Sequence, residues 1–296
     1  MTTTTSTIFS TAALSPPTSF LIHHTRTVTS LSFCFRPHRN RRRGFSSLAA
    51  VASTATWTRA PLTLIHPATV DGSLFHISID ISDQTDLVTA HTLAGQYLQL
   101  RLPGVPDAKP AFLAIASPPS LAKEKGEFEF LVKTVPESTA EVLCQMGKGE
   151  IVELSAVMGK GFPVERIKDA DDVFMFATGS GISPIRSLIE SDINADESSN
   201  VTLYYGARNL DRMAYQDRFQ HWESSSGVKI VPVLSQPEKS WEGETGYVQA
   251  AFARIKQILK PSSTGAVLCG HNKMAEDVTS ALVSDGVLSD KILMNF

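Results

Sequence analysis

The chain has 296 residues, 42% of them hydrophobic, a formal net charge of −3 and three cysteines. At roughly 100–200 residues per domain, this length predicts two domains. No apolar run approaches the ~18 residues that span a bilayer, which excludes an integral membrane protein. Three cysteines without a Cys-x-x-Cys pair exclude a disulfide framework and a structural zinc site. The absence of metal-binding histidine motifs, a nucleophile-elbow serine and a P-loop disfavours hydrolases and nucleoside triphosphatases.

The net charge conceals an uneven distribution along the chain. The first acidic residue is Asp71, and seven arginines but no lysine precede it. A Ser-rich, Arg-rich and acid-free N-terminus is typical of an organelle transit peptide. We expect residues 1–57 to be a disordered transit peptide, and the threonine run at 2–5 favours the chloroplast, with the mature protein in the stroma. The alternative is a basic arm that binds nucleic acid through the arginines at 39–43.

The rest of the chain is acidic. Residues 71–296 hold 20 basic and 30 acidic residues, which gives a net charge of −10. Such a surface repels phosphate backbones, so we expect no nucleic-acid partner for the folded part.

Two different hydrophobic patterns follow each other after the N-terminal segment. Alternation with period two at 75–81, 97–102 and 127–133 predicts short strands, with one short helix at 139–146. Residues 58–168 are therefore expected to form a small antiparallel β-barrel. From residue 169 to residue 296, buried strands alternate with helices, which predicts an α/β domain with a doubly wound parallel sheet. We place the boundary in the polar segment 166–171.

The expected elements of the second domain are five strands and four helices. The strands are predicted at 173–177, 201–205, 229–234, 266–269 and 292–294. The helices are predicted to start at Pro184 and to cover 212–222, 247–259 and 272–284.

The strongest local motif is a glycine turn between a buried strand and a helix, Thr178-Gly179-Ser180-Gly181 followed by Pro184. Glycines let the backbone approach a pyrophosphate closely, and the helix N-terminus behind them favours an anion. Pro184 in the first helical turn loses no needed hydrogen bond. Gly-x-Gly alone also fits an ordinary strand-to-helix turn, and the third glycine of the Rossmann fingerprint is absent.

Further motifs follow the glycine turn in order. Tyr-Gly-Ala-Arg begins at Tyr205, Ser-Gln-Pro at Ser235, Gly-Tyr at Gly246, and Cys-Gly-His-Asn-Lys-Met at Cys269. Most of them lie where a predicted parallel strand ends, which is where open α/β sheets bind ligands. As an ordered set they resemble the NAD(P)-binding domain of the ferredoxin–NADP reductase superfamily, and the chain looks closest to its plant plastid branch.

The resemblance covers residues 60–296 and implies that the first domain binds FAD and the second NAD(P)H. It implies that Cys269 is the catalytic residue, near the nicotinamide C4; the alternative for Cys269 is a buried small side chain. The implied cofactor-binding residues are Phe112, Leu113, Ala114, Ile115, Ser117, Val132, Lys133, Ser138, Thr139, Thr178, Gly179, Gly181, Ser183, Pro184, Tyr205, Gly206, Arg208, Ser235, Gln236, Tyr247, Gly270, Met274 and Phe296.

The chain departs from the family pattern on the flavin side. The family reads Arg-x-Tyr-Ser where this sequence reads Ala111-Phe112-Leu113-Ala114, so the arginine for the pyrophosphate and the tyrosine for the flavin ring are missing. Lys109 or Lys133 is the candidate to supply the charge. Three residues have a plain alternative: Phe112 as a core side chain, Arg208 as a partner of Asp211, and Phe296 as strand packing.

The predicted function is a flavin-dependent oxidoreductase that passes hydride from NAD(P)H to FAD and electrons to an unidentified acceptor, a small molecule or a redox protein. The alternative is a non-catalytic nucleotide-binding regulatory protein with a degraded flavin site. Because Gln236 stands where NADP-specific relatives carry arginine, and glutamates at 238, 242 and 244 follow, we expect NADH to be used at least as well as NADPH.

Overall fold

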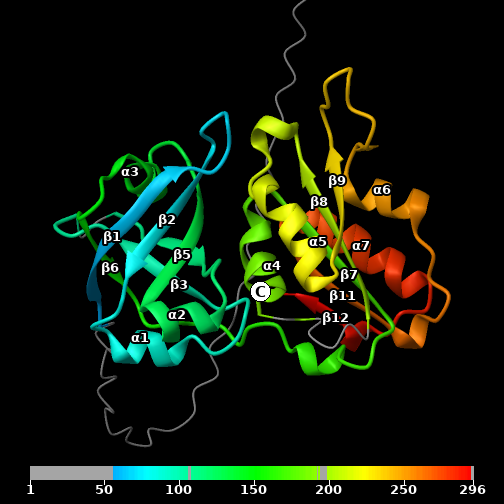
Figure 1. Ribbon diagram of the computed structural model, residues 1–296, viewed down its shortest axis with the longest axis horizontal. Helices are drawn as coiled ribbons and strands as arrows, with labels where there is room; N and C mark the ends of the chain where they lie inside the picture. Colours follow the sequence, from blue (N-terminus) through cyan, green and yellow to red (C-terminus); the bar gives the residue numbers. More distant parts are fainter. Residues whose placement is uncertain (1–55, 106–107, 192, 194–198, 295–296) are drawn as a thin grey trace, which may run out of the picture. The chain divides into compact units, whose positions relative to one another are not determined.

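A computed structural model describes residues 56–105, 108–191, 193 and 199–294 in two sheets (Figure 1). Residues 1–55 of the expected transit peptide, and Phe296, lie outside the described residues. Within them the longest helix has 13 residues, so none there can cross a bilayer.

The first sheet is antiparallel and has six strands in the order β4-β3-β6-β1-β2-β5. An isolated bridge from Ile115 to Phe130 brings the two edge strands, β4 and β5, together, so the sheet nearly closes into a barrel. The period-two pattern accounts for the interior, because Phe128, Phe130 and Val132 of β5 are all fully buried in it. The strands are β1 (Thr58–Pro67), β2 (Leu74–Asp80), β3 (Tyr97–Arg101), β4 (Ala111–Ala114), β5 (Glu127–Lys133) and β6 (Ile151–Leu154).

Three helices accompany the barrel: α1 (Thr85–Ala90), α2 (Pro119–Lys125) and α3 (Thr139–Gln145). Only α3 was expected. Although Pro118 and Pro119 disfavour a helix interior, Pro119 occupies the first turn of α2, where a missing N–H costs nothing. Gly126 ends α2 in the left-handed conformation, with φ of 62°.

The second sheet is parallel and has the strand order β10-β9-β8-β7-β11-β12. Its strands are β7 (Asp172–Thr178), β8 (Asn200–Ala207), β9 (Lys229–Leu234), β10 (Glu244–Thr245), β11 (Thr264–Cys269) and β12 (Ile292–Met294). The two-residue β10 was not expected. The direction of winding reverses between β7 and β11, so the crevice for ligands is expected at their carboxyl ends.

Helices cover both faces of this sheet, as the continuous apolar strands require. On one face, α4 (Ile182–Ile189) and α5 (Phe219–Ser226) pack in one core cluster with Met175 and Leu203. On the other, α6 (Val248–Ile255) and α7 (Asn272–Ser284) pack with Phe174 and Phe176. The predicted fold class, a β-barrel followed by a doubly wound α/β domain, is confirmed.

The helix expected at 212–222 is wrong. Two 3₁₀ turns, Leu210–Arg212 and Gln216–Arg218, occupy this stretch, and α5 begins only at Phe219. Tyr215 stands between the turns with φ of 63°, a left-handed conformation that an α-helix cannot contain. The polar segment 166–171, where we expect the domain boundary, lies between the last barrel strand and β7.

Candidate active site

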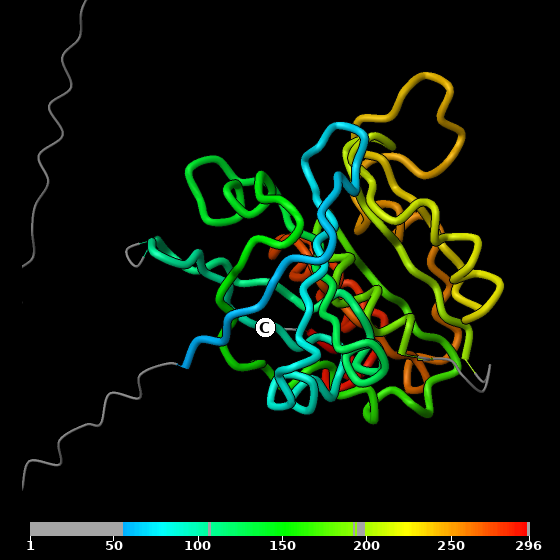
Figure 2. Tube along the Cα trace, turned by 60° about the vertical axis from the view of Figure 1, so that its left-hand side comes forward, coloured from blue at the N-terminus to red at the C-terminus, as the bar shows by residue number. Residues whose placement is uncertain are grey.

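A cleft of about 1300 Å³ lies between the carboxyl ends of the parallel strands and strands β4 and β5 of the barrel. The turn between β1 and β2 also reaches it and lies beside the segment that follows β8 (Figure 2). Asp71 of this turn pairs with Arg212 at 2.9 Å, and its backbone N–H donates to the carbonyl of Asp211. Ser73, which follows in this turn, lines the cleft together with Arg212.

The cleft is positively charged in an otherwise acidic protein. Five cationic side chains line it, and among the described residues no aspartate or glutamate does. The five are Lys109, Lys133, Arg208, Arg212 and Lys273. A cavity with this lining suits a ligand that carries several phosphates.

Three of these five cations form no ion pair with a described residue, whereas the other two do. Arg212 pairs with Asp71, and Lys273 pairs with Asp277 at 2.7 Å. Lys109, Lys133 and Arg208 form no ion pair with any described residue, so the alternative in which Arg208 only pairs with Asp211 is wrong.

The glycine turn forms the floor of the cleft on the nucleotide side. Gly179–Gly181 is a 3₁₀ turn that leads directly into α4, and no side chain caps that helix. A Cβ on Gly181 would collide with the carbonyl oxygen of Cys269 and lie 2.7 Å from its carbonyl carbon. Only glycine therefore allows the ends of β7 and β11 to approach this closely, and the helix N-terminus stays open to an anion.

Cys269 ends β11 and lines the cleft beside Gly270 and Met274. Burial raises the pKa of its thiol to about 12, because the thiolate would lose its hydration. The side chain is therefore a neutral thiol at physiological pH, which suits contact with a ligand ring and excludes a thiolate nucleophile.

Two aromatic side chains are exposed in the cleft, one from the barrel and one from the α/β domain. Phe112 of β4 is 65% exposed and Tyr247, just before α6, is 69% exposed. The alternative of Phe112 as a core residue is thus wrong. Flat apolar faces of this kind suit the ring systems of a dinucleotide.

Ser138 and Thr139 line the cleft, but other parts of the chain already engage their hydroxyls. Ser138 Oγ donates to the carbonyl of Val135 and accepts from the backbone N–H of Glu141. Thr139 Oγ1 donates to the carbonyl of Lys109 at 2.8 Å. Thr139 thus holds the segment that presents Lys109 to the cleft, a role that its motif did not indicate.

Most of the predicted site residues come together. Those that line the cleft, besides Cys269, are Phe112, Leu113, Ala114, Val132, Lys133, Ser138, Thr139, Thr178, Gly179, Gly181, Ser183, Pro184, Gly206, Arg208, Ser235, Gln236, Tyr247, Gly270 and Met274.

Three predicted residues do not line the cleft. Ile115 is fully buried and donates its backbone N–H to the carbonyl of Gln96. Ser117 is buried, with its hydroxyl accepting from the backbone N–H of Glu129. Tyr205 is buried beneath the glycine turn, where its hydroxyl accepts from the backbone N–H of Ala214. All three are buried next to segments that line the cleft, and their hydrogen bonds hold those segments in place.

Sequence reasoning missed several residues of the cleft. Ser73 and Arg212 arrive through the contact of the β1–β2 turn with the segment after β8, which no local pattern encodes. Lys273 lies inside the Cys-Gly-x-x-x-Met motif, so its position alone could have indicated it.

Comparison with known proteins places this geometry in a family. Residues 175–280 match the family model for an oxidoreductase NAD-binding domain. The chain is 44% identical over 247 residues to the fruit protein pKIWI502 of Actinidia deliciosa, with 81% of this chain and 77% of that protein covered. The chain belongs to the ferredoxin–NADP reductase superfamily. Within it, the chain is a member with an NAD-binding oxidoreductase domain.

More distant relatives share part of their length with the chain. It is 31% identical over 206 residues to the reductase component DmpP of phenol 2-monooxygenase from Pseudomonas, and covers 56% of that protein. A ferredoxin NADP⁺ reductase of Neisseria gonorrhoeae with bound FAD and NADP has a similar fold, with a TM-score of 0.65 at 20% identity over 81% of this chain and 98% of that one. The CS-b5R domains of human Ncb5or align with a TM-score of 0.67 at 17% identity, over 83% of this chain and 71% of that one.

Proposed function

We propose that the protein is a flavin-dependent oxidoreductase that takes hydride from NAD(P)H and passes electrons to an acceptor still to be identified. The observation that carries the proposal is the cleft between the barrel and the glycine turn, which is lined by five cations and, within the part of the chain that the structure describes, by no acid. Two dinucleotides that meet there would bring their phosphates to these cations. FAD and NADP bound to the gonococcal reductase of similar fold support this assignment.

The barrel side fits FAD, although the arginine and the tyrosine of the family pattern are absent. Lys109 and Lys133 are free to neutralise its pyrophosphate, and exposed Phe112 offers an apolar face to a flat ring. The small side chain of Ala111 leaves space where the pattern has arginine. When bound, the flavin supplies the hydride- and electron-transfer chemistry.

The nucleotide side fits NAD(P)H. Gly179 and Gly181 open the N-terminus of α4 to the pyrophosphate, while Ser235 and Gln236 line the end of β9 for the adenosine ribose. Tyr247 lies at the same end of the cleft and offers its exposed ring to the adenine. The neutral thiol of Cys269, which lines the cleft, would pack against a bound nicotinamide without exchanging a proton with it.

The protein's own contribution is alignment. Holding two rings in contact removes much of the entropic cost of a bimolecular hydride transfer. A second candidate is a regulatory protein that binds nucleotides without turnover, and the missing arginine and tyrosine at Ala111 and Leu113 favour it.

Purification of the full chain separates the two candidates. The oxidoreductase should be yellow, with close to one FAD per chain, and should oxidise NADH or NADPH with artificial acceptors such as ferricyanide. Protein acceptors, among them ferredoxin and cytochromes, are then compared; the acidic surface leads us to expect weak activity with acidic ferredoxins. A colourless protein that binds NADH but leaves it unoxidised, even with added FAD, would establish the regulatory candidate.

A further inference from the structure

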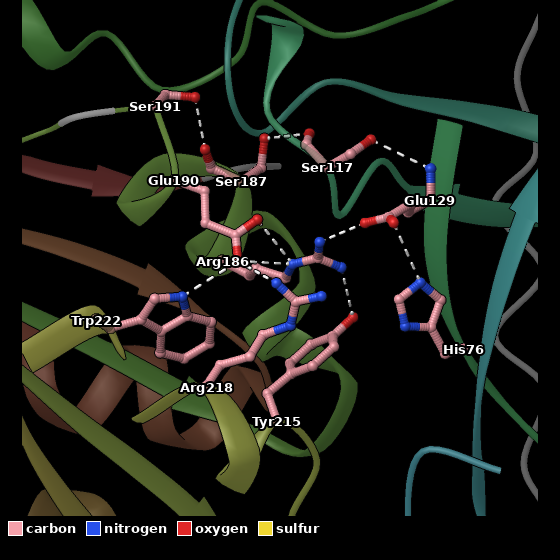
Figure 3. Close-up of polar contacts among 10 residues, drawn as sticks. All are labelled: His76, Ser117, Glu129, Arg186, Ser187, Glu190, Ser191, Tyr215, Arg218 and Trp222. Carbon is pink, nitrogen blue, oxygen red and sulfur yellow. Dashed lines mark hydrogen bonds and ion pairs between the residues drawn. The ribbon is translucent and has the colours of Figure 1, made fainter. Parts of the chain in front are cut away.

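Arg186 of α4 is a buried cation outside the cleft. It is 2% exposed, five residues beyond Gly181, and does not line the cavity. Every nitrogen of its guanidinium has a partner (Figure 3). Nε donates to both carboxylate oxygens of Glu190, Nη1 to the hydroxyl of Tyr215 at 3.4 Å, and Nη2 to the carboxylate of Glu129.

The contact between Arg186 and Glu129 joins helix α4 of the α/β domain to strand β5 of the barrel. Burial opposes ionisation of Glu129, but the approach of His76 and the charge of Arg186 lower its pKa to about 2. His76 Nε2 lies 3.7 Å from the other carboxylate oxygen. On the far side, Arg218 pairs with Glu190 at 3.0 Å. The two arginines therefore balance the two carboxylates.

Glu129 is also hydrogen-bonded to the segment that follows β4, which borders the flavin side of the cleft. Its carbonyl accepts from the N–H of Ala116, and its N–H donates to the hydroxyl of Ser117. Both residues follow Leu113 and Ala114, which line the cleft.

Two serines of α4 donate hydrogen bonds to the same segment, residues 114–117. Ser183 Oγ donates to the carbonyl of Ala114 at 3.3 Å, and Ser187 Oγ donates to the carbonyl of Ser117 at 2.8 Å. With Arg186 they occupy positions i, i+3 and i+4, which is one face of the helix. The helix that begins at the glycine turn is thus fixed to residues 114–117 directly by the two serines and indirectly by Arg186, through Glu129 of β5.

Buried ion pairs generally add little to stability compared with apolar side chains of similar size, but they impose one geometry. We propose that Arg186 is a positioning residue that fixes the separation between the glycine turn and strand segment 113–117, and so the distance between nicotinamide and flavin. The inference rests on the proposed function. Arg186 touches neither cofactor and acts through Glu129.

The test compares R186M, R186K and E129Q with the full-length wild type, each loaded with FAD. Anaerobic single-turnover reduction at increasing NADH concentrations gives a dissociation constant and a limiting rate separately. R186M should lower the limiting rate at least tenfold and change the dissociation constant less than threefold, with flavin content unchanged. R186K should recover part of the rate, because an ammonium can contact one carboxylate but cannot bridge two.

Arg101→Met is the matched control, since the same kind of substitution removes another ion pair, that between Arg101 and Glu153 at 2.7 Å within the barrel, and neither residue lines the cleft. It should leave the limiting rate within twofold of wild type. The double variant R186M/E129Q should lose no more than R186M alone, because the two residues act as a unit. If R186M fails to fold, E129Q keeps an acceptor oxygen and should show the same pattern more weakly.

Hydrogen exchange without nicotinamide gives a readout that does not depend on activity. The amide of Ala116, bonded to Glu129, should exchange faster in R186M than in wild type or Arg101→Met. A wild-type limiting rate in R186M, or equal losses in R186M and the control, would overturn the inference. If the wild type cannot be reduced at all by NADH, the proposed function fails. Unchanged exchange of the Ala116 amide in R186M would independently overturn the positioning role of Arg186.

Discussion

Cys269 shows how one buried side chain constrains the chemistry. Its pKa of about 12 keeps the thiol neutral through the working range. We therefore predict that the pH profile of the limiting rate of flavin reduction is the same for wild type and C269A between pH 7 and 9.5. The variant should be slower by about 10- to 100-fold, because the ring loses a packing contact in a near-attack geometry. Stopped-flow reduction across this range measures both effects. A change of the limiting rate near pH 9 that is present in the wild type and absent in C269A would show that the thiol ionises there, and would contradict the prediction.

His91 carries a stability prediction of its own. The ring is fully buried against Phe128, and neither nitrogen has a hydrogen-bond partner among the described residues. Burial, with Lys123 nearby, lowers its pKa to about 4. Between pH 6.5 and 4 the unfolded chain therefore binds a proton that the folded chain does not. The free energy of unfolding should fall by about 3 kcal/mol as pH drops through this window.

Urea unfolding of apoprotein at pH 7 and pH 5 tests the prediction. His91→Leu should flatten the dependence on pH, whereas the exposed His221→Gln should keep it. An equal slope in all three proteins would mean that His91 is not the titrating group.

The residues that sequence reasoning found are those carried by local motifs. The glycine turn and the residues around Cys269 need only a strand end and a short spacing, so their place at the carboxyl edge could be predicted. Lys109 and Arg212 line the cleft because a distant residue holds each of them, Thr139 in one case and Asp71 in the other. Sequence separations of 30 and more leave no periodic signal.

At the level of elements, regular patterns fared best. Helix 272–284 and strand 127–133 were predicted with the observed bounds, since each has a clear period and a clear end. The stretch 212–222 has helix-forming residues, yet Tyr215 is drawn into the buried contact with Arg186 and takes a left-handed conformation. Here a tertiary contact outweighed local propensity.

The loop after β9 carries the prediction on cofactor choice. Gln236 lines the cleft, and its backbone N–H donates to the carbonyl of Arg208, so Arg208 is the cation that the structure brings to this end. The glutamates at 238, 242 and 244 do not line the cleft, and their effect on a 2′-phosphate acts over a distance. We predict that NADH is used at least as well as NADPH; a kcat/KM for NADPH more than tenfold above that for NADH, about 1.4 kcal/mol of preference, would contradict this.

Gln236→Arg should shift the NADPH-to-NADH ratio of kcat/KM upward at least tenfold, because a guanidinium can bind the added phosphate in a bidentate manner. Ser240→Arg adds the same charge to the same loop outside the cleft, and should shift the ratio less than threefold. Equal shifts in the two variants would mean that long-range charge, rather than contact at Gln236, sets the preference.

For the whole molecule, sequence reasoning predicted two sheets of different kinds and their order, because alternating and continuous apolar strands differ in pattern. It did not predict how the sheets dock. The contact between Arg186 and Glu129 joins residues 57 apart, and the barrel residues Leu74 and Phe162 share a core cluster with α4. Such contacts depend on both folded surfaces at once.

The N-terminal segment gives the last prediction. Its charge opposes that of the rest: seven arginines and no acid precede Asp71, while residues 71–296 carry a net charge of −10. Import machineries of organelles accept basic, serine-rich and acid-poor leaders. A fluorescent protein fused behind residues 1–57 should enter chloroplasts, and immunoblots should show cleavage between about 45 and 58. Replacing the arginines at 41–43 with glutamate should leave the fusion in the cytosol, whereas alanines at the threonines 2–5 should matter less. Retention of the unaltered fusion in the cytosol, or its entry into the nucleus, would instead favour a basic arm that binds nucleic acid.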